Sequence, residues 1–307
     1  MVTRTKNLRL EDDRYFGESR AYRVFSVFNM LALVLIVLAT AYPVYFVLIA
    51  SISDPTKMVS NYGLMWLPHF PLSMLSYERV FRHSLILSGF QNTLFIVVAG
   101  VAVNMALTIL GAYLLSLKNS MFRKPIAYMI LFTMYFSGGI VPSYLNVKSL
   151  GLMDSLWALI LPTAINTYNM LIMRSAIAGL PDALMEAARL DGASHWRRIV
   201  HVVIPLTGAT AAVLILYYAI GHWNAWFNAS LYIQTPKRYP LQLVLRQVLI
   251  LGEDSEMVSG LDAGMDIAAA MMIKYALIVV STAPIMVLYP FLQRFFVKGV
   301  MVGSVKG

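Results

Sequence analysis

The stretch EAARLDGASHWRRIVHVVIP, residues 186–205, is the most polar part of the second half of the chain, and long apolar segments enclose it. Pro181 and Asp182 stand just before it, where proline suits a first helical turn and aspartate favours the positive end of a helix. Good helix formers then continue to Leu190 and give one mostly apolar side. Gly192 can adopt the left-handed conformation that ends a helix. The stretch therefore predicts a short amphipathic helix, a turn and a basic return segment on a membrane surface.

The composition is that of a membrane protein. Hydrophobic residues make up 59% of the 307 residues, only 13% are charged, and the mean hydropathy is +0.69. A soluble chain carries about 25% charged residues. The basic residues behind the net charge of +9 are scattered at the ends of apolar segments, which indicates topology signals and not a nucleic-acid surface. The absence of cysteine excludes disulfides and thiolate sites, and without clustered His or carboxylates neither a metal nor a cofactor is expected.

Six apolar segments are long enough to cross a bilayer at about 1.5 Å per residue. They cover residues 24–50, 89–117, 125–145, 155–177, 207–233 and 267–296. Gly138, Gly139 and Pro142 are expected to bend or break the third segment, and Pro284 to kink the sixth. The predicted fold class is an all-α membrane protein, with a polar tail over 1–23 and a membrane domain over 24–307.

Orientation follows from the basic residues. If the N-terminus faces the cytoplasm, sixteen of the 24 Lys and Arg residues lie on that side and seven on the other. Lys274 lies within the sixth segment, where reaching toward the outer interface is the simpler interpretation and a functional role the other. Since basic residues favour the cytoplasmic side, both termini and the loop 178–206 are predicted there, in a multi-pass protein of the cell membrane.

The spacing of this loop resembles a known motif. Residues 186–188 (Glu-Ala-Ala) precede Gly192 by three residues, and nine residues later come Val202, Ile204 and Pro205. This resembles the EAA motif of ABC-importer permease subunits, in which Ile and Leu occupy the positions of Val202 and Ile204. Both replacements keep an apolar side chain. The resemblance implies a type I ABC importer permease with six transmembrane helices.

Two further stretches resemble the maltose-type carbohydrate permeases. They are KGVMVGSVKG at 298–307 and the pair Trp223-Asn224 in the fifth segment. From residue 24 onward the chain resembles the second permease of an oligosaccharide importer, nearest to the branch that handles fragments such as uronate-containing oligosaccharides. The implied partners are a homologous permease subunit, a cytoplasmic ABC ATPase dimer and an extracellular solute-binding protein.

The resemblance also implies that residues 186–192 form a coupling helix seated in a groove of the ATPase. Glu186 would pair with a basic residue there, the two small alanines would permit close approach, and Gly192 would permit the turn. The residues assigned to this contact are Glu186, Ala187, Ala188, Arg189, Asp191 and Gly192. The alternative from the residues alone is an amphipathic helix that rests on lipid headgroups.

Polar residues inside the apolar segments have two interpretations. Asn104 and Thr108 share a helix face, and they would either form hydrogen bonds between spans or contribute to a sugar path. Other amides and aromatics suit a sugar path, since amides bond hydroxyls and aromatic faces cover pyranose rings. The candidates for the path are Trp223, Asn224, Trp226, Asn228, Asn166 and Asn169. The alternatives for them are interhelical bonds, an interfacial aromatic belt, or a path held mainly by the partner permease.

The loop 234–266 is either a solvated connector or, by the resemblance, the dock for the binding protein, with a short helix over 241–251. The chain carries no G-x-x-x-x-G-K-[ST] phosphate loop, so it is not predicted to be an enzyme, and a separate ATPase is required. A self-contained secondary transporter is the alternative. It requires an ion site or paired carboxylates within the membrane, whereas every acid here lies at or outside the end of a predicted span.

Overall fold

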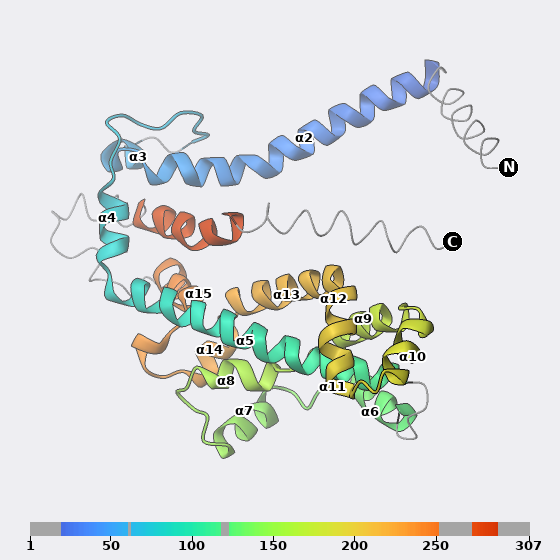
Figure 1. Cartoon of the computed structure of the whole chain (residues 1–307). Helices are drawn as coiled ribbons and strands as arrows, with labels where there is room; N and C mark the ends of the chain where they lie inside the picture. Colours follow the sequence, from blue (N-terminus) through green and yellow to red (C-terminus); the bar gives the residue numbers. More distant parts are fainter. Residues whose placement is uncertain (1–19, 61–62, 118–122, 252–271, 288–307) are drawn as a thin grey trace.

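The computed structural model describes residues 20–60, 63–117, 123–251 and 272–287 (Figure 1). Every regular element in these ranges is helical, and no strand occurs among them. The all-α class predicted from the sequence is therefore confirmed. By length and composition, two described helices can cross a membrane, and up to four if each of two bent helix pairs forms one span. The count of six spans stays a prediction.

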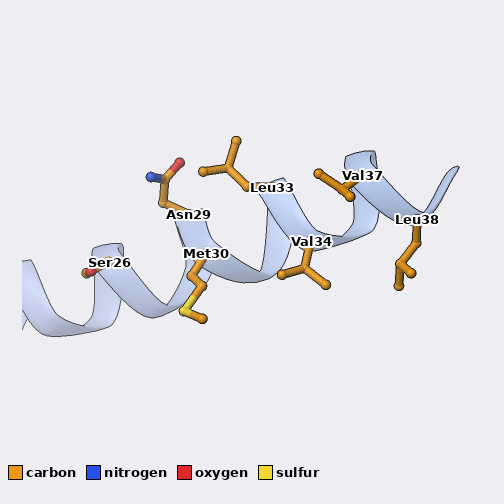
Figure 2. A pocket seen from close by; sticks show the side chains of 7 residues that line it. All are labelled: Ser26, Asn29, Met30, Leu33, Val34, Val37 and Leu38. Carbon is orange, nitrogen blue, oxygen red and sulfur yellow. The ribbon is translucent and has the colours of Figure 1, made fainter. Parts of the chain in front are cut away.

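Helix α2 (Arg20–Ser51) extends away from the rest of the molecule over most of its length (Figure 1). At about 1.5 Å per residue, its 32 residues exceed the bilayer core of about 30 Å. Figure 2 shows part of this helix, where side chains between Ser26 and Leu38 project from α2 alone. Large apolar side chains such as Leu31 and Leu35 are exposed there. Because water is a poor solvent for such a surface, it suits lipid or another protein.

The other end of α2 is attached to the body of the protein. Phe46 meets Tyr275 edge to face, with ring centroids 5.8 Å apart, and Ile49 is buried beside Met65. Tyr275 belongs to the last described helix, Met272–Val287. The first and last described helices are therefore in contact although they are far apart in the chain.

Helix α5 (Ser84–Ser116) is central to the fold. Three buried apolar clusters follow one another along it, and each is built with a different set of later helices. Representative members are Ile86, Leu241 and Leu277 in the first, Ile96, Leu159 and Ala229 in the second, and Ala112, Met173 and Leu214 in the third. Thus α5 holds together helices from the whole second half of the chain.

The predicted third span, residues 125–145, consists of two helices. Helices α6 (Arg123–Tyr135) and α7 (Ile140–Ser149) meet at 116°. Gly139 lies between them with φ of 88°, a conformation that glycine adopts without strain. The break expected from the Gly138-Gly139 pair is therefore confirmed.

The predicted fourth span, residues 155–177, is not one continuous helix as expected. It contains α8 (Trp157–Ile160), the 3-10 turn η1 (Leu161–Thr163) and α9 (Thr167–Ala178). Pro162 lacks an amide hydrogen and its ring clashes with a preceding turn, so it opposes a continuous helix. Asn166 then begins a new helix, because its Oδ1 accepts the backbone N–H of Asn169 at 3.0 Å. The sequence did not predict this capping role of Asn166.

The predicted fifth span, residues 207–233, is also interrupted. It contains α13 (Gly208–Trp223) and α14 (Phe227–Tyr232). After Trp223, the amides of Ala225 and Trp226 bond to the nearby carbonyls of His222 and Asn224 and not to carbonyls four residues back. Asparagine favours such turns because its side chain competes with helical bonding.

The remaining elements are short. They are α3 (Pro55–Ser60), α4 (Leu75–Arg82), α10 (Asp182–Leu190), α11 (His195–Arg198), the π-turn η2 (Ile199–Val203), α12 (Ile204–Leu206), the 3-10 turn η3 (Pro236–Arg238), α15 (Leu241–Arg246) and the π-turn η4 (Gln247–Leu251). The helix predicted over 241–251 is thus confirmed as α15 and η4. In Figure 1, α10 lies at the end of the molecule where α5 finishes, and α15 lies at the end where α5 begins.

Several predicted features lie outside the described residues. They are the polar tail up to residue 19, the loop tip at 252–266, the two ends of the predicted sixth span, and the stretch 298–307.

Candidate functional site

Helix α10 has the local structure expected from its sequence. It begins after Pro181 and carries Asp182 in its first turn. At its end the N–H of Gly192 donates to the carbonyl of Arg189 at 3.1 Å, and the N–H of Ala193 donates to that of Ala188 at 3.0 Å. This pair of bonds is the Schellman arrangement, which requires a left-handed residue. Gly192 supplies it with φ of 72°, so the predicted role of this glycine in the turn is confirmed.

No residue of α10 is buried. Leu190 is 89% exposed, and Leu184 is also exposed. Glu186 and Ala187 are exposed beside them, whereas Ala188 is half-buried. An apolar and acidic surface on a short helix that projects from the molecule is suited to contact with another protein.

The side of α10 that carries Glu186 borders a hollow of 640 Å³ between this helix, α11 and the ends of α5, α6 and α9. The ionisable residues that line it are Asp182, Glu186 and Arg189 of α10, together with Arg123, His195 and Arg198. Apolar side chains, Met185 among them, complete the wall. Glu186 and Arg189 therefore stand at the edge of a charged hollow and do not pack into the core.

The return segment after α10 is tied to α5. The hydroxyl of Tyr113 and Nδ1 of His195 are 2.9 Å apart, and the two rings meet edge to face with centroids 5.8 Å apart. Ser194 begins α11 by accepting the N–H of Arg197 at 3.3 Å. Arg198 is only 9% exposed. The contact of His195 with Tyr113 was not foreseen, because nothing in the local sequence of His195 indicates a partner so far away.

A buried polar group lies farther along α5. Nδ2 of Asn104 donates to the carbonyls of Thr163 and Ala164 at 2.7 and 2.9 Å, and Oδ1 lies 2.6 Å from Nε2 of His222. Asn104 is fully buried and His222 is 7% exposed. One turn of α5 away, the hydroxyls of Thr108 and Tyr218 are 2.7 Å apart. The interhelical bonds predicted for Asn104 and Thr108 are confirmed, and His222 is an additional member that the sequence did not single out.

The two amides Asn166 and Asn169, predicted for the sugar path, lie at the break before α9. Asn166 is exposed and caps the helix through its side chain. Asn169 is 6% exposed and lies in the first turn. The structure therefore leaves the side chain of Asn166 at the surface of this chain and buries that of Asn169.

Trp223, Asn224, Trp226 and Asn228 lie around the second break, and they differ in surroundings. Trp223 is 6% exposed, and its Nε1 donates to the carbonyl of Ser281 at 3.2 Å. This geometry favours the packing interpretation for Trp223. Asn224 is exposed, and Asn228 is half-buried.

Trp226 has a charged neighbour that the sequence did not reveal. The guanidinium carbon of Arg246 lies 4.2 Å from the centroid of the indole ring. Such a cation–π contact fixes the ring and leaves a positive charge beside it. Trp226 therefore lies at the start of α14 beside the end of α15, and Trp226 and Arg246 are both half-buried.

An ionic cluster joins the loop around Asp154 to the loop that begins at Gln234. Oδ1 of Asp154 accepts the backbone N–H groups of Gln234 and Thr235, each at 2.9 Å. Its Oδ2 accepts the hydroxyl of Thr235 at 2.6 Å and a guanidinium N–H of Arg238 at 2.9 Å. The Thr235 hydroxyl, with the backbone amides and Arg238, lowers the pKa of Asp154 from 3.8 to about 2. This cluster anchors the start of the loop 234–266.

Comparison with known proteins places this architecture in a family. Residues 114–302 match the family described as "Binding-protein-dependent transport system inner membrane component". The chain therefore belongs to this family of membrane transport permeases. The family resemblance inferred from residues 186–205 is confirmed.

Two relatives from Bacillus subtilis match over nearly the full length. One is the "Polygalacturonan/rhamnogalacturonan transport system permease protein YtcP", 37% identical over 290 residues, which are 93% of this chain and 99% of the relative. The other is "Protein LplC", 38% identical over 289 residues, which are 94% and 97% of the two chains.

A solved structure shares the fold. One chain of the crystal structure of a bacterial ABC transporter involved in the import of the acidic polysaccharide alginate superimposes with a TM-score of 0.82. The two chains are 29% identical, and the match covers 91% of this chain and 98% of the other. The fold is therefore that of an ABC importer permease.

Proposed function

We propose that this chain is one of two permease subunits of an ATP-driven importer for uronate-containing oligosaccharides. The observation that carries the proposal is full-length similarity to two transport chains whose names state related cargo. YtcP is named for polygalacturonan and rhamnogalacturonan, and the structural relative belongs to an alginate importer. Galacturonan and alginate are both polymers of uronic acids, so an acidic sugar chain is the cargo common to both.

Both termini and α10 face the cytoplasm in this proposal. The distribution of Lys and Arg supports it. In Figure 1 the Arg20 end of α2 lies toward the same end of the molecule as α10. A cytoplasmic α10 is placed where an ATPase can reach it, and the loop from residue 234 onward is placed where an extracellular binding protein can dock.

Helix α10 is the coupling element. Its exposed surface, with Leu190 at 89% exposure, is covered when it enters a groove on one ATPase subunit. Glu186 pairs there with a basic residue, Ala187 and Ala188 allow close approach, and Arg189 and Asp191 flank the contact. The Schellman turn at Gly192 sets the direction of the return segment, and the bond between His195 and Tyr113 carries the motion of α10 to α5.

The sugar path lies between this chain and its homologous partner. Asn166 and Asn224 are exposed polar side chains at the two breaks in the apolar segments, and Trp226 with Asn228 lies beside the second break. ATP-driven closure of the ATPase dimer draws the two coupling helices together, and the path opens outward while the binding protein releases its sugar. Hydrolysis resets the path. ATP is cleaved on the ATPase subunits, and this chain supplies no bond-breaking residue.

The test begins with affinity purification of the tagged chain in mild detergent and mass spectrometry of the co-purified proteins. We expect a P-loop ATPase and a second permease. The purified assembly, reconstituted in proteoliposomes with its binding protein, should import galacturonate oligosaccharides only when ATP is inside. Uptake by the isolated chain without ATP would contradict the proposal and support a secondary transporter.

A further inference from the structure

The hydrogen-bonded cluster around Asn104 lies on the buried side of the break in the predicted fourth span. Asn104 is on α5, His222 is on α13, and the carbonyls that Asn104 binds belong to Thr163 and Ala164 in the break. Three segments therefore meet at one side chain that has no exposed surface.

The hydrogen-bond pattern assigns a direction to each bond. Nδ2 of Asn104 donates to both carbonyls, at 2.7 and 2.9 Å, so Oδ1 is the atom that faces His222. An amide oxygen only accepts hydrogen bonds. Nε2 of His222, 2.6 Å away, must therefore carry a proton and donate it to Asn104. His222 thus orients the amide that pairs the two carbonyls of the break.

The two carbonyls need this partner. Where a helix breaks within a membrane, its freed backbone groups must find other partners, because hydrocarbon supplies none. Asn104 satisfies one carbonyl on each of two consecutive residues. Without Asn104, the break would lose the two hydrogen bonds that hold Thr163 and Ala164 against α5.

The protein leaves room for His222 at Gly100. A Cβ added to Gly100 would lie 2.5 Å from Nε2 and 2.8 Å from Cδ2 of the imidazole. Any larger side chain at this position therefore displaces the ring from Asn104. The close approach of α5 and α13 and the hydrogen bond depend on the same glycine.

The opposite side of the break is exposed. Asn166 is exposed there, and Ile165 and Tyr168 are exposed at 54% and 58%. In transporters, broken helices at membrane depth supply substrate sites because irregular backbone is tolerated where it lines a cavity. The break thus has a buried side held by Asn104 and a side open to a ligand or the partner permease.

We propose that Asn104 and His222 form a positioning pair that holds residues 161–166 so that Asn166 faces the sugar path. This inference rests on the proposed function, since it assigns the pair to the path of that importer. The pair touches no sugar. It determines where the Asn166 amide meets the hydroxyls of the oligosaccharide as the path opens and closes.

This chain has no cysteine, so a spin label on one introduced cysteine reports on the break once any reactive cysteines of the other subunits have been replaced. The label is attached to Ile165→Cys in the assembled importer, and the same label on Val141→Cys in α7 serves as a reference position. His222→Phe keeps a ring of similar size but lacks the donor, whereas His222→Gln keeps an N–H donor without the ring. We expect label motion at position 165 to increase about tenfold with Phe and to stay near the parent value with Gln, because loss of the donor frees the break.

A second pair of variants tests the hydrogen bond between His222 and Asn104 without changing either residue. Gly100→Ala forces the imidazole away from Asn104. The matched control is Gly111→Ala, whose Cβ would also meet a neighbour at 2.5 Å, but that neighbour is the flexible end of Met170. We expect Gly100→Ala to mobilise the label and Gly111→Ala to leave it nearly unchanged.

Transport gives the second readout. With ATP and binding protein present, His222→Phe should lower oligosaccharide uptake about tenfold while ATP hydrolysis continues, and His222→Gln should restore uptake. Unchanged label motion and unchanged uptake in both His222→Phe and Gly100→Ala would overturn the positioning pair. If the parent assembly imports no acidic oligosaccharide, the proposed function fails, but the label at position 165 still decides whether the pair holds the break.

Discussion

Helix α10 and the polar group around Asn104 are built in opposite ways. The bonds that end α10 join residues close in sequence, such as Ala193 and Ala188. The bonds of Asn104 reach 60 residues ahead to Ala164 and 118 residues ahead to His222. No residue of α10 is buried, whereas Asn104 is fully buried. The first region offers a surface to a partner, and the second holds distant helices together, so damage to them should have different consequences.

The largest expected effect comes from Asn104→Leu. The substitution leaves two backbone carbonyls and the His222 imidazole without their partner. At about 0.6 kcal/mol for each interhelical bond in a membrane protein, three lost bonds cost about 2 kcal/mol, and unpaired groups add to this. The midpoint of thermal unfolding in detergent should fall.

Ala106→Leu is the control for that change, since it places the same side chain at an exposed position of α5. It should leave the midpoint near the parent value. Equal midpoints for the two leucine variants would mean that the polar group contributes little to stability, and the contrast with α10 would disappear.

Glu186→Ala should leave stability unchanged and reduce transport. Because no residue of α10 is buried and Glu186 is exposed, membrane insertion and thermal stability should stay at parent values. Loss of a charge pair with the ATPase should reduce uptake and ATPase co-purification about tenfold. Glu78→Ala is the control, because Glu78 is an exposed acid paired with Arg82 at 2.6 Å, and surface pairs of this kind contribute about 0–1 kcal/mol. Normal uptake with Glu186→Ala would count against the coupling role.

Gly192→Ala tests the turn rather than the contact. A Cβ at this position meets nothing within 4 Å, so the cost arises only from φ of 72° and should be about 1–2 kcal/mol. Uptake should fall by less than with Glu186→Ala, and limited proteolysis should cut the segment near residue 192 faster. Gly208→Ala also meets nothing within 4 Å and has no left-handed backbone, so it should be neutral in the same assay.

The smallest effect concerns the pH dependence of the anchor formed by Asp154. Because the folded pKa of Asp154 is lowered from 3.8 to about 2, its contribution to stability is present above pH 3.8 and is lost as the pH falls toward 2. Protease accessibility of the segment near residue 235 should stay low from neutral pH down to about 4. Asp154→Asn should raise accessibility at neutral pH, and an equal response in both proteins would show that Asp154 does not anchor the loop.

The correct predictions share a local cause. The α10 helix, its Gly192 turn and the break at Gly138-Gly139 all follow from residue types whose backbone preferences act over a few positions. The helix over 241–251 likewise follows from a mostly apolar run after Pro240. Assignment to the permease family rested on spacing within one stretch of twenty residues, and the comparisons confirmed it.

The features that were missed have a different cause. The predicted fourth and fifth spans were taken as continuous because their composition is apolar throughout. Pro162 was a visible signal for the first break, but no residue near Asn166 indicates that it caps a helix. No partner was predicted for His222, Tyr113 or Arg246.

By itself, the sequence determined the membrane class, the permease family, the α10 helix with its glycine turn, and the break before α7. These follow from composition and from short-range backbone preferences. Only the tertiary structure decided that Asn104 pairs with His222 and the carbonyls at the break, that Trp223 packs against the last described helix, and that Asp154 anchors the start of the loop from residue 234. Hydrogen bonds between residues far apart in the chain depend on how the helices meet, and that geometry is fixed by packing along α5 rather than by any local stretch.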